Sequence, residues 1–213
     1  NTTLINQVVV YTITPTSAGC AGDPFTISVT VRPEPVGSTS TEAAVCSDAV
    51  TGYVLAATGA SSYSITINNN GLAQSAGSGT ANIISDDAWT NKTNGVVNVV
   101  YTITPFSGSC AGAVYTVTVP ITPEPLGVST TANVCSNTAF NYDLQADNIT
   151  GLGNGLASTF TWSAADNVNV TGEPVGAQAT STISSTLINT TLINQVVVYT
   201  ITPTSAGCAG DPF

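Results

Sequence analysis

The segment VVVYTITPTSAGCAGDPFTISVTVRPEP, residues 8–35, decides the fold class. Its two ends, Val8–Thr14 and Phe25–Val31, are rich in β-branched residues that alternate with polar ones, a pattern that predicts two strands. The Pro, Ser, Gly and Asp residues between them predict a turn. We therefore expect a β-hairpin, followed by the stiff sequence Arg32-Pro33-Glu34-Pro35.

This hairpin recurs along the chain. Residues 1–25 return without change at 189–213, and a diverged copy, VVNVVYTITPFSGSCAGAVYTVTVPITPEP, covers residues 96–125. The anchor residues Tyr11, Tyr101 and Tyr199 lie 90 and 98 residues apart, so a unit of about that length is repeated. An unchanged copy indicates recent duplication, and we expect a sequence like that from Thr26 onward to follow Phe213.

Weaker alternation upstream of each hairpin predicts further short strands, and no stretch shows a useful helical period. Short strands with turn signals between them predict an all-β chain of tandem immunoglobulin-like β-sandwich domains in a rod or filament. We expect residues 1–34 to be the C-terminal strands of a preceding repeat, 35–124 a complete repeat, and 125–213 a second repeat lacking its last strand. The upstream strands are marked by Tyr53, Leu55 and Ala57, matched by Phe140, Tyr142 and Leu144, and by Tyr63, Ile65 and Ile67, matched by Phe160 and Trp162.

The predicted inter-domain linkers are Pro33, Glu34 and Pro35, and Pro123, Glu124 and Pro125. Proline fixes its own φ and pushes the preceding residue toward extended geometry, so these linkers should hold the domains nearly in line. We expect the two glutamates to be solvated. Strands of about ten residues at ~3.3 Å each make every domain at least ~33 Å long.

Composition excludes several classes of function. Two basic residues against twelve acidic ones give a net charge of −10, which argues against binding to nucleic acid or to an anionic membrane surface. No apolar segment is long enough to span a membrane, and no signal peptide is visible at Asn1. The absence of His excludes Ser–His catalysis, and we predict no enzyme activity and no cofactor.

A few residues resemble sites, and we expect a structural role for each. The adjacent pair Asp86 and Asp87 is predicted to lie in a solvated loop, with calcium ligation as the alternative. Trp162 and Trp89 are predicted core residues; a sugar-stacking surface is the alternative for Trp162. Lys92, near two asparagines, is predicted to be a surface lysine rather than part of a Lys–Asn isopeptide bond.

The five cysteines Cys20, Cys46, Cys110, Cys135 and Cys208 favour an oxidising, extracellular setting. Each unit has one early cysteine and one in its final hairpin, and these two positions lie at opposite ends of a simple sandwich. A disulfide requires Cα atoms within about 7 Å, so we favour an inter-domain bridge, Cys46–Cys208. The same-domain pairs Cys46–Cys110 and Cys135–Cys208, and free thiols, are the alternatives.

Taken together, the motifs VxYTITPxSxxCAG, VTVxxxPEP and VCS (Val45-Cys46-Ser47 and Val134-Cys135-Ser136) resemble the PKD-like and immunoglobulin-like repeats of Bacteroidetes surface proteins. They are most similar to repeats of giant SprB-like gliding-motility adhesins. Trp89-Thr90-Asn91 departs from the Leu187-Ile188-Asn189 form, which suggests two alternating repeat types. The resemblance implies type IX secretion, display at the bacterial cell surface, and a role in adhesion.

The predicted function is therefore a non-catalytic structural stalk repeat of a large secreted adhesin, with neighbouring repeats of the same chain as partners. One alternative is that the repeats themselves bind extracellular polysaccharide or a substratum by weak multivalent contacts. Another is that they are spacer domains of a large secreted enzyme.

Overall fold

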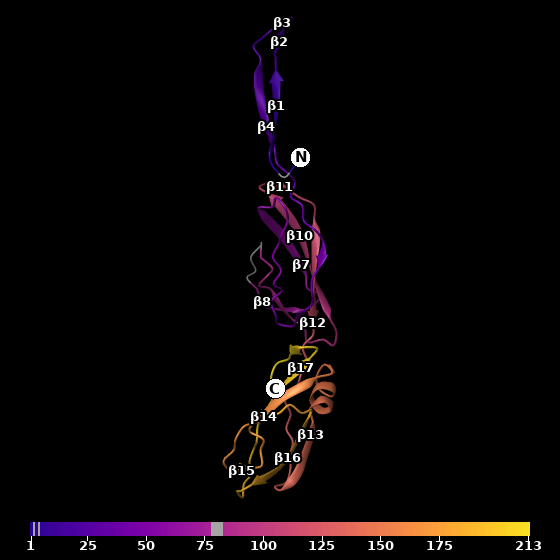
Figure 1. The fold of residues 1–213 in the computed structure, drawn as a ribbon, viewed down its shortest axis with the longest axis vertical. Coiled ribbons are helices and arrows are strands. Elements are labelled where there is room, and N and C mark those ends of the chain that lie inside the picture. The colour runs from indigo at the N-terminus through magenta and orange to yellow at the C-terminus, as the bar shows by residue number, and fades with distance from the viewer. Residues whose placement is uncertain (2, 4, 78–82) are drawn as a thin grey trace.

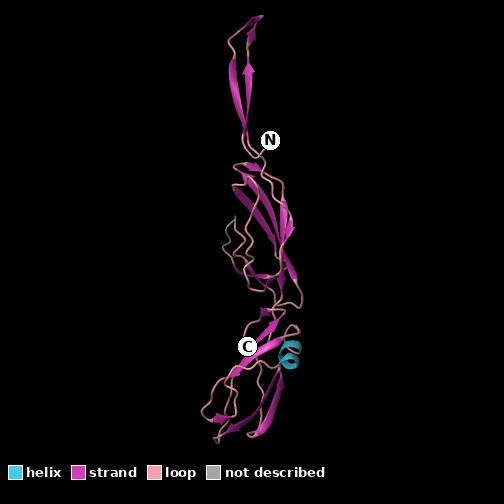
Figure 2. Ribbon diagram, in the orientation of Figure 1, coloured by secondary structure: helices cyan, strands magenta, loops and turns pink. Residues whose placement is uncertain are grey.

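A computed structural model describes residues 1–213 of the chain except Thr2, Leu4 and residues 78–82. The two residues Thr2 and Leu4 of the repeated segment thus lie outside the described part. Three bodies follow one another along the long axis of the molecule: an N-terminal hairpin, a first sandwich and a second sandwich (Figure 1). The predicted all-β class is confirmed (Figure 2), with one short helix added in the second sandwich.

The N-terminal hairpin projects from the end of the first sandwich. Strands β1 (Gln7–Ile13) and β4 (Phe25–Val31) pair antiparallel with Tyr11 opposite Ile27, and β2 (Thr16–Ser17) and β3 (Cys20–Ala21) form the tip. The apolar residues of both long strands are exposed, because this hairpin packs on no second sheet.

The first sandwich is built around its two long final strands, β10 and β12, which pair antiparallel. β7 pairs with the other edge of β10, and the short strands β5 and β6 pair in parallel with the free edge of β12. The β8–β9 hairpin contributes to the opposite layer. The bounds are β5 Ser40–Thr41, β6 Val45–Cys46, β7 Ser62–Asn68, β8 Ala73–Ala76, β9 Ala88–Thr90, β10 Val97–Ser107, β11 Cys110–Ala111 and β12 Tyr115–Thr122.

Period-2 alternation decides which residues form this core. Along β12 buried and half-buried residues alternate strictly, so Tyr115, Val117, Val119 and Ile121 all point inward. They meet Val99, Tyr101 and Ile103 of β10, and Trp89 of β9 lies in the same cluster, as predicted. Residues 53–57 do not form the predicted strand, although their alternate side chains still pack against the core.

The second sandwich has two three-stranded sheets, β13-β16-β15 and β14-β17-β18. Phe160 and Trp162 of β14 point into its core, as predicted for Trp162, together with Ile183 and Ile201. Leu144 ends the predicted alternation of β13 because the chain there enters a six-residue π-helix that the sequence pattern did not indicate. The bounds are β13 Thr138–Asp143, η1 Gln145–Thr150, β14 Thr159–Ala164, β15 Val170–Thr171, β16 Thr182–Asn189, β17 Tyr199–Ser205 and β18 Cys208–Ala209.

Candidate functional site at the joint between the sandwiches

The joint between the two sandwiches is closed by a disulfide bond. Cys46 and Cys208 are bonded with a Cα–Cα distance of 5.4 Å and a sequence separation of 162. Of the pairings that the sequence left open, the structure contains this inter-domain one. Cys20, Cys110 and Cys135 are free thiols.

Local structure brings each of the two sulfurs to the joint. Ala206 and Gly207 both have positive φ, the geometry of a two-residue hairpin turn, so Cys208 opens the returning strand directly opposite Ser205. Cys46 lies in β6, which pairs in parallel with the end of β12 at Thr122. The hairpin tip of the second sandwich therefore meets the early strand of the first. Cys110 lies at the far end of the first sandwich, beside the N-terminal hairpin (Figure 1).

The linker Pro123-Glu124-Pro125 is buried within this joint rather than exposed between the sandwiches. All three residues are buried, and the Glu124 amide donates to the Asn91 carbonyl at 3.0 Å. The expectation that Glu124 is solvated is wrong, because the tip of the next sandwich covers it and leaves its side chain 3% exposed. At the other linker Pro33 and Pro35 are buried, whereas Glu34 is exposed as expected.

Lys92 lies across the joint and forms an ion pair with each sandwich. Its Nζ donates to Asp211 Oδ2 at 2.8 Å and lies 3.6 Å from Glu124 Oε1, a distance too long for a hydrogen bond. Asn91 presents this lysine, because its side-chain oxygen accepts from the Thr93 amide and its Nδ2 donates to the Ile121 carbonyl. Lys92 thus binds carboxylates, and the isopeptide alternative finds no support in its contacts.

Asn154 of the second sandwich adds a cluster of hydrogen bonds across the joint. Its Nδ2 lies within hydrogen-bonding distance of the carbonyls of Lys92, Thr93 and Glu124, at 3.2, 3.0 and 2.8 Å. Its Oδ1 accepts from the amide of Leu126 at 3.0 Å. One side chain therefore ties a loop of the first sandwich and both sides of the linker to the second sandwich.

The charges at the joint are unequally solvated. Burial raises the pKa of the Glu124 carboxyl, the neighbouring carboxylates of Asp48 and Asp211 raise it further, and Lys92 opposes the change. The hydrogen bond to Asp211 raises the pKa of the Lys92 ammonium group. The joint thus holds one exposed ion pair beside a buried carboxyl group whose ionisation is disfavoured.

A glycine after Cys-Ala is required at both joints of the chain. A Cβ on Gly210 would lie 2.1 Å from the Pro125 carbonyl oxygen, and one on Gly112 would lie 2.0 Å from the Pro35 carbonyl oxygen. Any side chain there would collide with the linker backbone. The repeated Cys-Ala-Gly motif is thus explained by close packing of each hairpin tip on the linker before it.

The comparisons with known proteins bear on these repeated joints. The sequence profile of the PKD-like domain matches residues 1–35, 41–125 and 132–213. The chain belongs to the PKD-like domain family. A comparison with curated proteins gives no match. Among solved structures, the FN1–FN3 domains of chicken CNTN1 share 11% identity over 95% of this chain and 74% of that one, with a TM-score of 0.29.

The family assignment confirms the predicted fold class of tandem PKD-like, immunoglobulin-like sandwiches. PKD-like domains are typical of extracellular surface proteins and are usually non-catalytic, and no enzyme domain is detected. In the described part of the chain no helix has the length and apolarity that crossing a membrane requires.

The two PKD-like repeat types differ at the joint in a complementary way. Alignment of the repeats places Thr190 at the position of Lys92 and Ala113 at the position of Asp211. The ion pair therefore belongs to one kind of joint, and the other kind has neutral residues at both positions. This paired exchange was present in the sequence and could have revealed Asp211, which the sequence analysis did not single out as a joint residue.

Asn154 was also missed by the sequence analysis. It lies in the glycine-rich stretch Gly151-Leu152-Gly153-Asn154-Gly155, where the second repeat is longer than the first. The extra length was the available signal. Only the fold shows that this stretch returns to the linker.

The predicted solvated pair Asp86-Asp87 needs a correction. Asp87 is only 3% exposed, and it accepts a hydrogen bond from the Tyr101 hydroxyl at 3.0 Å and one from Gln74 at 2.9 Å. Tyr101 in turn accepts from the Trp89 indole N–H at 2.8 Å. Burial raises the pKa of Asp87, and the bond from Tyr101 opposes that shift. The carboxylate is thus part of a buried polar chain inside the core.

The calcium alternative for this pair gains no support from the surroundings. Among the described residues, no group of three or more His, Cys, Asp or Glu side chains could hold a metal ion. The hydrogen bonds of Asp87 account for both of its oxygens.

Proposed function

We propose that this chain is part of the non-catalytic stalk of a large secreted bacterial surface protein, in which PKD-like units in series carry tension and set length. The observation that carries the proposal is the Cys46–Cys208 disulfide, which joins consecutive sandwiches outside the linker. A second covalent connection between neighbouring units is of little use to a binding or catalytic module. It is useful to a rod that is pulled.

The position of the bridge decides how tension travels. Force applied to the two ends of the chain passes along the backbone to Cys46, crosses the disulfide, and leaves through the few residues after Cys208. The residues between the two cysteines form a closed covalent loop. Most of both sandwiches is thus removed from the path of the force.

The non-covalent contacts at the joint support the same function. The linker is buried, Asn154 binds carbonyls on both sides of it, and Lys92 pairs with carboxylates from both sandwiches. Several independent contacts at one short linker resist bending, which a flexible tether would permit. The sandwiches accordingly follow one another along one axis (Figure 2).

The more specific assignment, a cell-surface adhesin of the gliding-motility kind, rests on the sequence resemblance together with the extracellular character of PKD-like domains. Binding of polysaccharide by the repeats themselves and service as spacers in a secreted enzyme stay predictions. The joint would serve a spacer equally well, since its geometry concerns spacing and not the identity of the distal domain.

Small-angle X-ray scattering tests the stiffness on which the proposal depends. The oxidised chain should give one narrow distribution of pair distances that matches the extended arrangement. A variant with Pro123→Gly, Pro125→Gly and Cys46→Ser should give a broader distribution with a shorter mean separation of the sandwiches. The stalk function is contradicted if the unmodified, oxidised chain already samples a broad range of bends.

A further inference from the structure

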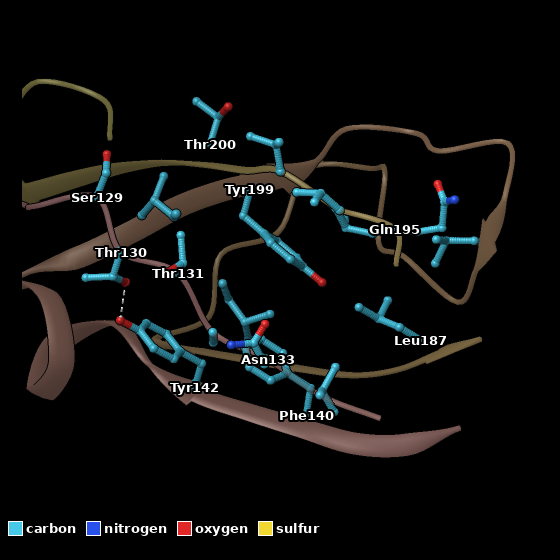
Figure 3. A pocket seen from close by; sticks show the side chains of 18 of the residues that line it. Ser129, Thr130, Thr131, Asn133, Phe140, Tyr142, Leu187, Gln195, Tyr199 and Thr200 are labelled. Atoms are coloured by element: carbon cyan, nitrogen blue, oxygen red, sulfur yellow. Dashed lines mark hydrogen bonds between the residues drawn. The ribbon is translucent and has the colours of Figure 1, made fainter. Parts of the chain in front are cut away.

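The second sandwich contains an open groove beside strand β17. The groove has a volume of about 1040 Å³. Tyr142 and Leu187 lie on one side of it, Tyr199 lies on the other, and the segment 129–136 forms the rim (Figure 3). Its walls carry aromatic and aliphatic side chains that belong to the sandwich interior.

In the first sandwich a strand fills the corresponding space. There β12 lies between β10 and the short strands β5 and β6, and its side chains of Val117, Val119 and Ile121 are fully buried. Among the described residues β17, the counterpart of β10, pairs only with β14 and β18, apart from a first contact with Phe213. The groove is therefore the site of one β-strand.

Two identical sequences show the effect of this strand. Residues 1–25 and 189–213 are the same, yet Gln7–Val10 is strand, whereas residues 195–198 are not. The first copy pairs with β4 and the second has no such partner in the described structure. Because the sequences do not differ, the partner strand accounts for the difference.

Phe213 sets the register of the strand that would enter. Its backbone N–H and C=O exchange hydrogen bonds with Ile201 at 3.0 and 2.9 Å, and in the N-terminal hairpin the identical residues Ile13 and Phe25 are paired. Its ring also lies against Gly127, where a Cβ would be 2.0 Å from it, just as the ring of Tyr115 lies against Gly37. The first residue of the β12-like strand is thus already in place.

An asparagine at the end of the groove points to the same strand. Asn1 Nδ2 donates to the carbonyls of Ile5 and of Val31, the last residue of β4, at 2.8 and 2.9 Å. Asn91 makes the equivalent pair of bonds, one of them to Ile121 of β12. Asn189, at the same position of the second sandwich, donates to Ile193 and has no strand residue in the described structure for its second bond.

Strand β4 has the side chains that fit this groove. Its residues Ile27 and Val29 align with Val117 and Val119 of β12, but they are 47% and 43% exposed in the hairpin, whereas their counterparts are fully buried. We propose that a second copy of this chain inserts its strand β4 into the groove, antiparallel to β17, with Ile27 opposite Tyr199. The sandwich would be completed in trans, and the copies would join head to tail.

The free cysteines extend the proposal. Cys46 pairs in parallel with Thr122, and Thr122 aligns with Arg32, so the register places Cys135 of the acceptor beside Arg32 of the second copy. In each copy the Arg32 guanidinium lies against Gly108, two residues before Cys110. Cys135 and Cys110 of the second copy therefore occupy the places that Cys46 and Cys208 occupy in the observed bridge.

The bridge between copies forms by thiol–disulfide exchange. Oxidised glutathione accepts the two electrons: its S–S bond breaks, one S–S bond forms between Cys135 and Cys110 of the second copy, and two molecules of reduced glutathione are released with the two thiol protons. The inference does not rest on the stalk function, since it concerns only how the second sandwich acquires its last strand.

A closed variant gives the main test. Appending the sequence of residues 26–35 after Phe213 supplies the strand within the same chain. Analytical ultracentrifugation of the unmodified chain should show a population of dimers and longer oligomers that rises with concentration, and the closed variant should remain monomeric. A monomeric unmodified chain at the highest concentration tested, or equal association of both proteins, would overturn the proposal.

Substitutions in β4 supply a matched pair that leaves both sandwiches untouched. Val29→Asp places a charge on the inward face and should abolish association, whereas Ser28→Asp on the outward face should keep it. Val29→Asp still has an open groove, so it should bind a synthetic peptide of sequence 25–35, and the closed variant should not. Association that survives Val29→Asp rejects β4 as the donor.

Peptide mapping tests the second bridge. After incubation with oxidised glutathione, non-reducing digestion of the unmodified chain should yield a peptide that links Cys135 to Cys110, and the closed variant should lack it. A map in which oligomers are linked instead through Cys20 would reject the proposed arrangement.

Discussion

Breaking the Cys46–Cys208 disulfide should change the mechanical length of this chain more than any other single change. The bridge closes a loop with a sequence separation of 162, which contains most of both sandwiches. In the oxidised chain, tension between the termini can extend only the residues outside this loop. In the reduced chain, or in Cys46→Ser, the same tension acts on the whole backbone.

The structure gives the size of the effect. The two Cα atoms are 5.4 Å apart in the bridge, and 162 residues of extended chain at roughly 3.5 Å each span about 570 Å. Unfolding of both sandwiches after reduction should therefore release about 560 Å of contour length that the oxidised chain withholds. This is far larger than the variation expected from handle attachment or partial unfolding of a hairpin.

Single-molecule force spectroscopy with handles at the two termini measures this length directly. The oxidised chain should show only short extensions from the N-terminal hairpin and the segments outside the loop. Adding a reducing agent, or using Cys46→Ser, should expose the hidden length, and Cys20→Ser serves as the control that should behave like the unmodified chain. Full-length unfolding of the oxidised chain would refute the mechanical shielding.

Three further predictions concern the core and the joint. Tyr101→Phe leaves a buried carboxyl group and an indole N–H without their partner and should cost about 3 kcal/mol of unfolding free energy in a denaturant titration, whereas Tyr199→Phe, whose hydroxyl contact is 3.4 Å long, should cost well under 1 kcal/mol. Because burial raises the pKa of Glu124, the folded chain binds that proton more tightly than the unfolded chain, so unfolding free energy should fall as the pH rises through the raised pKa; Glu124→Gln should flatten this dependence, and an unchanged slope would contradict the burial argument. Asn154→Ala removes the hydrogen bonds across the joint and should speed hydrogen exchange of the linker amides while the exchange of the strand amides in both sandwiches stays the same.

The repeated hairpins were predictable from sequence because their signal is local. In Val97–Ser107 and Tyr115–Thr122 the alternation of β-branched and polar residues sets which side chains face inward, and the structure follows it residue by residue. The same logic correctly placed Trp162 inside. It misled at residues 53–57, where alternate side chains face the core without a regular hydrogen-bond ladder, since alternation reports orientation and not backbone pairing.

The errors at Asp87 and Glu124 have a different origin. A carboxylate in a loop or between prolines is usually solvated, and nothing in the adjacent residues of either one signals otherwise. Asp87 is buried because Tyr101, distant in the sequence, donates a hydrogen bond to it. Glu124 is buried because the tip of the following sandwich covers the linker.

The sequence by itself determined the repeat, the β class and the stiff proline linkers, because period, β-propensity and fixed φ are properties of neighbouring residues. Only the tertiary structure decided which cysteines meet, which charges are covered, and that residues 1–25 and 189–213 take different conformations. Pairing between strands is non-local, so an identical sequence becomes strand at Gln7 and remains irregular at Gln195 according to what lies beside it.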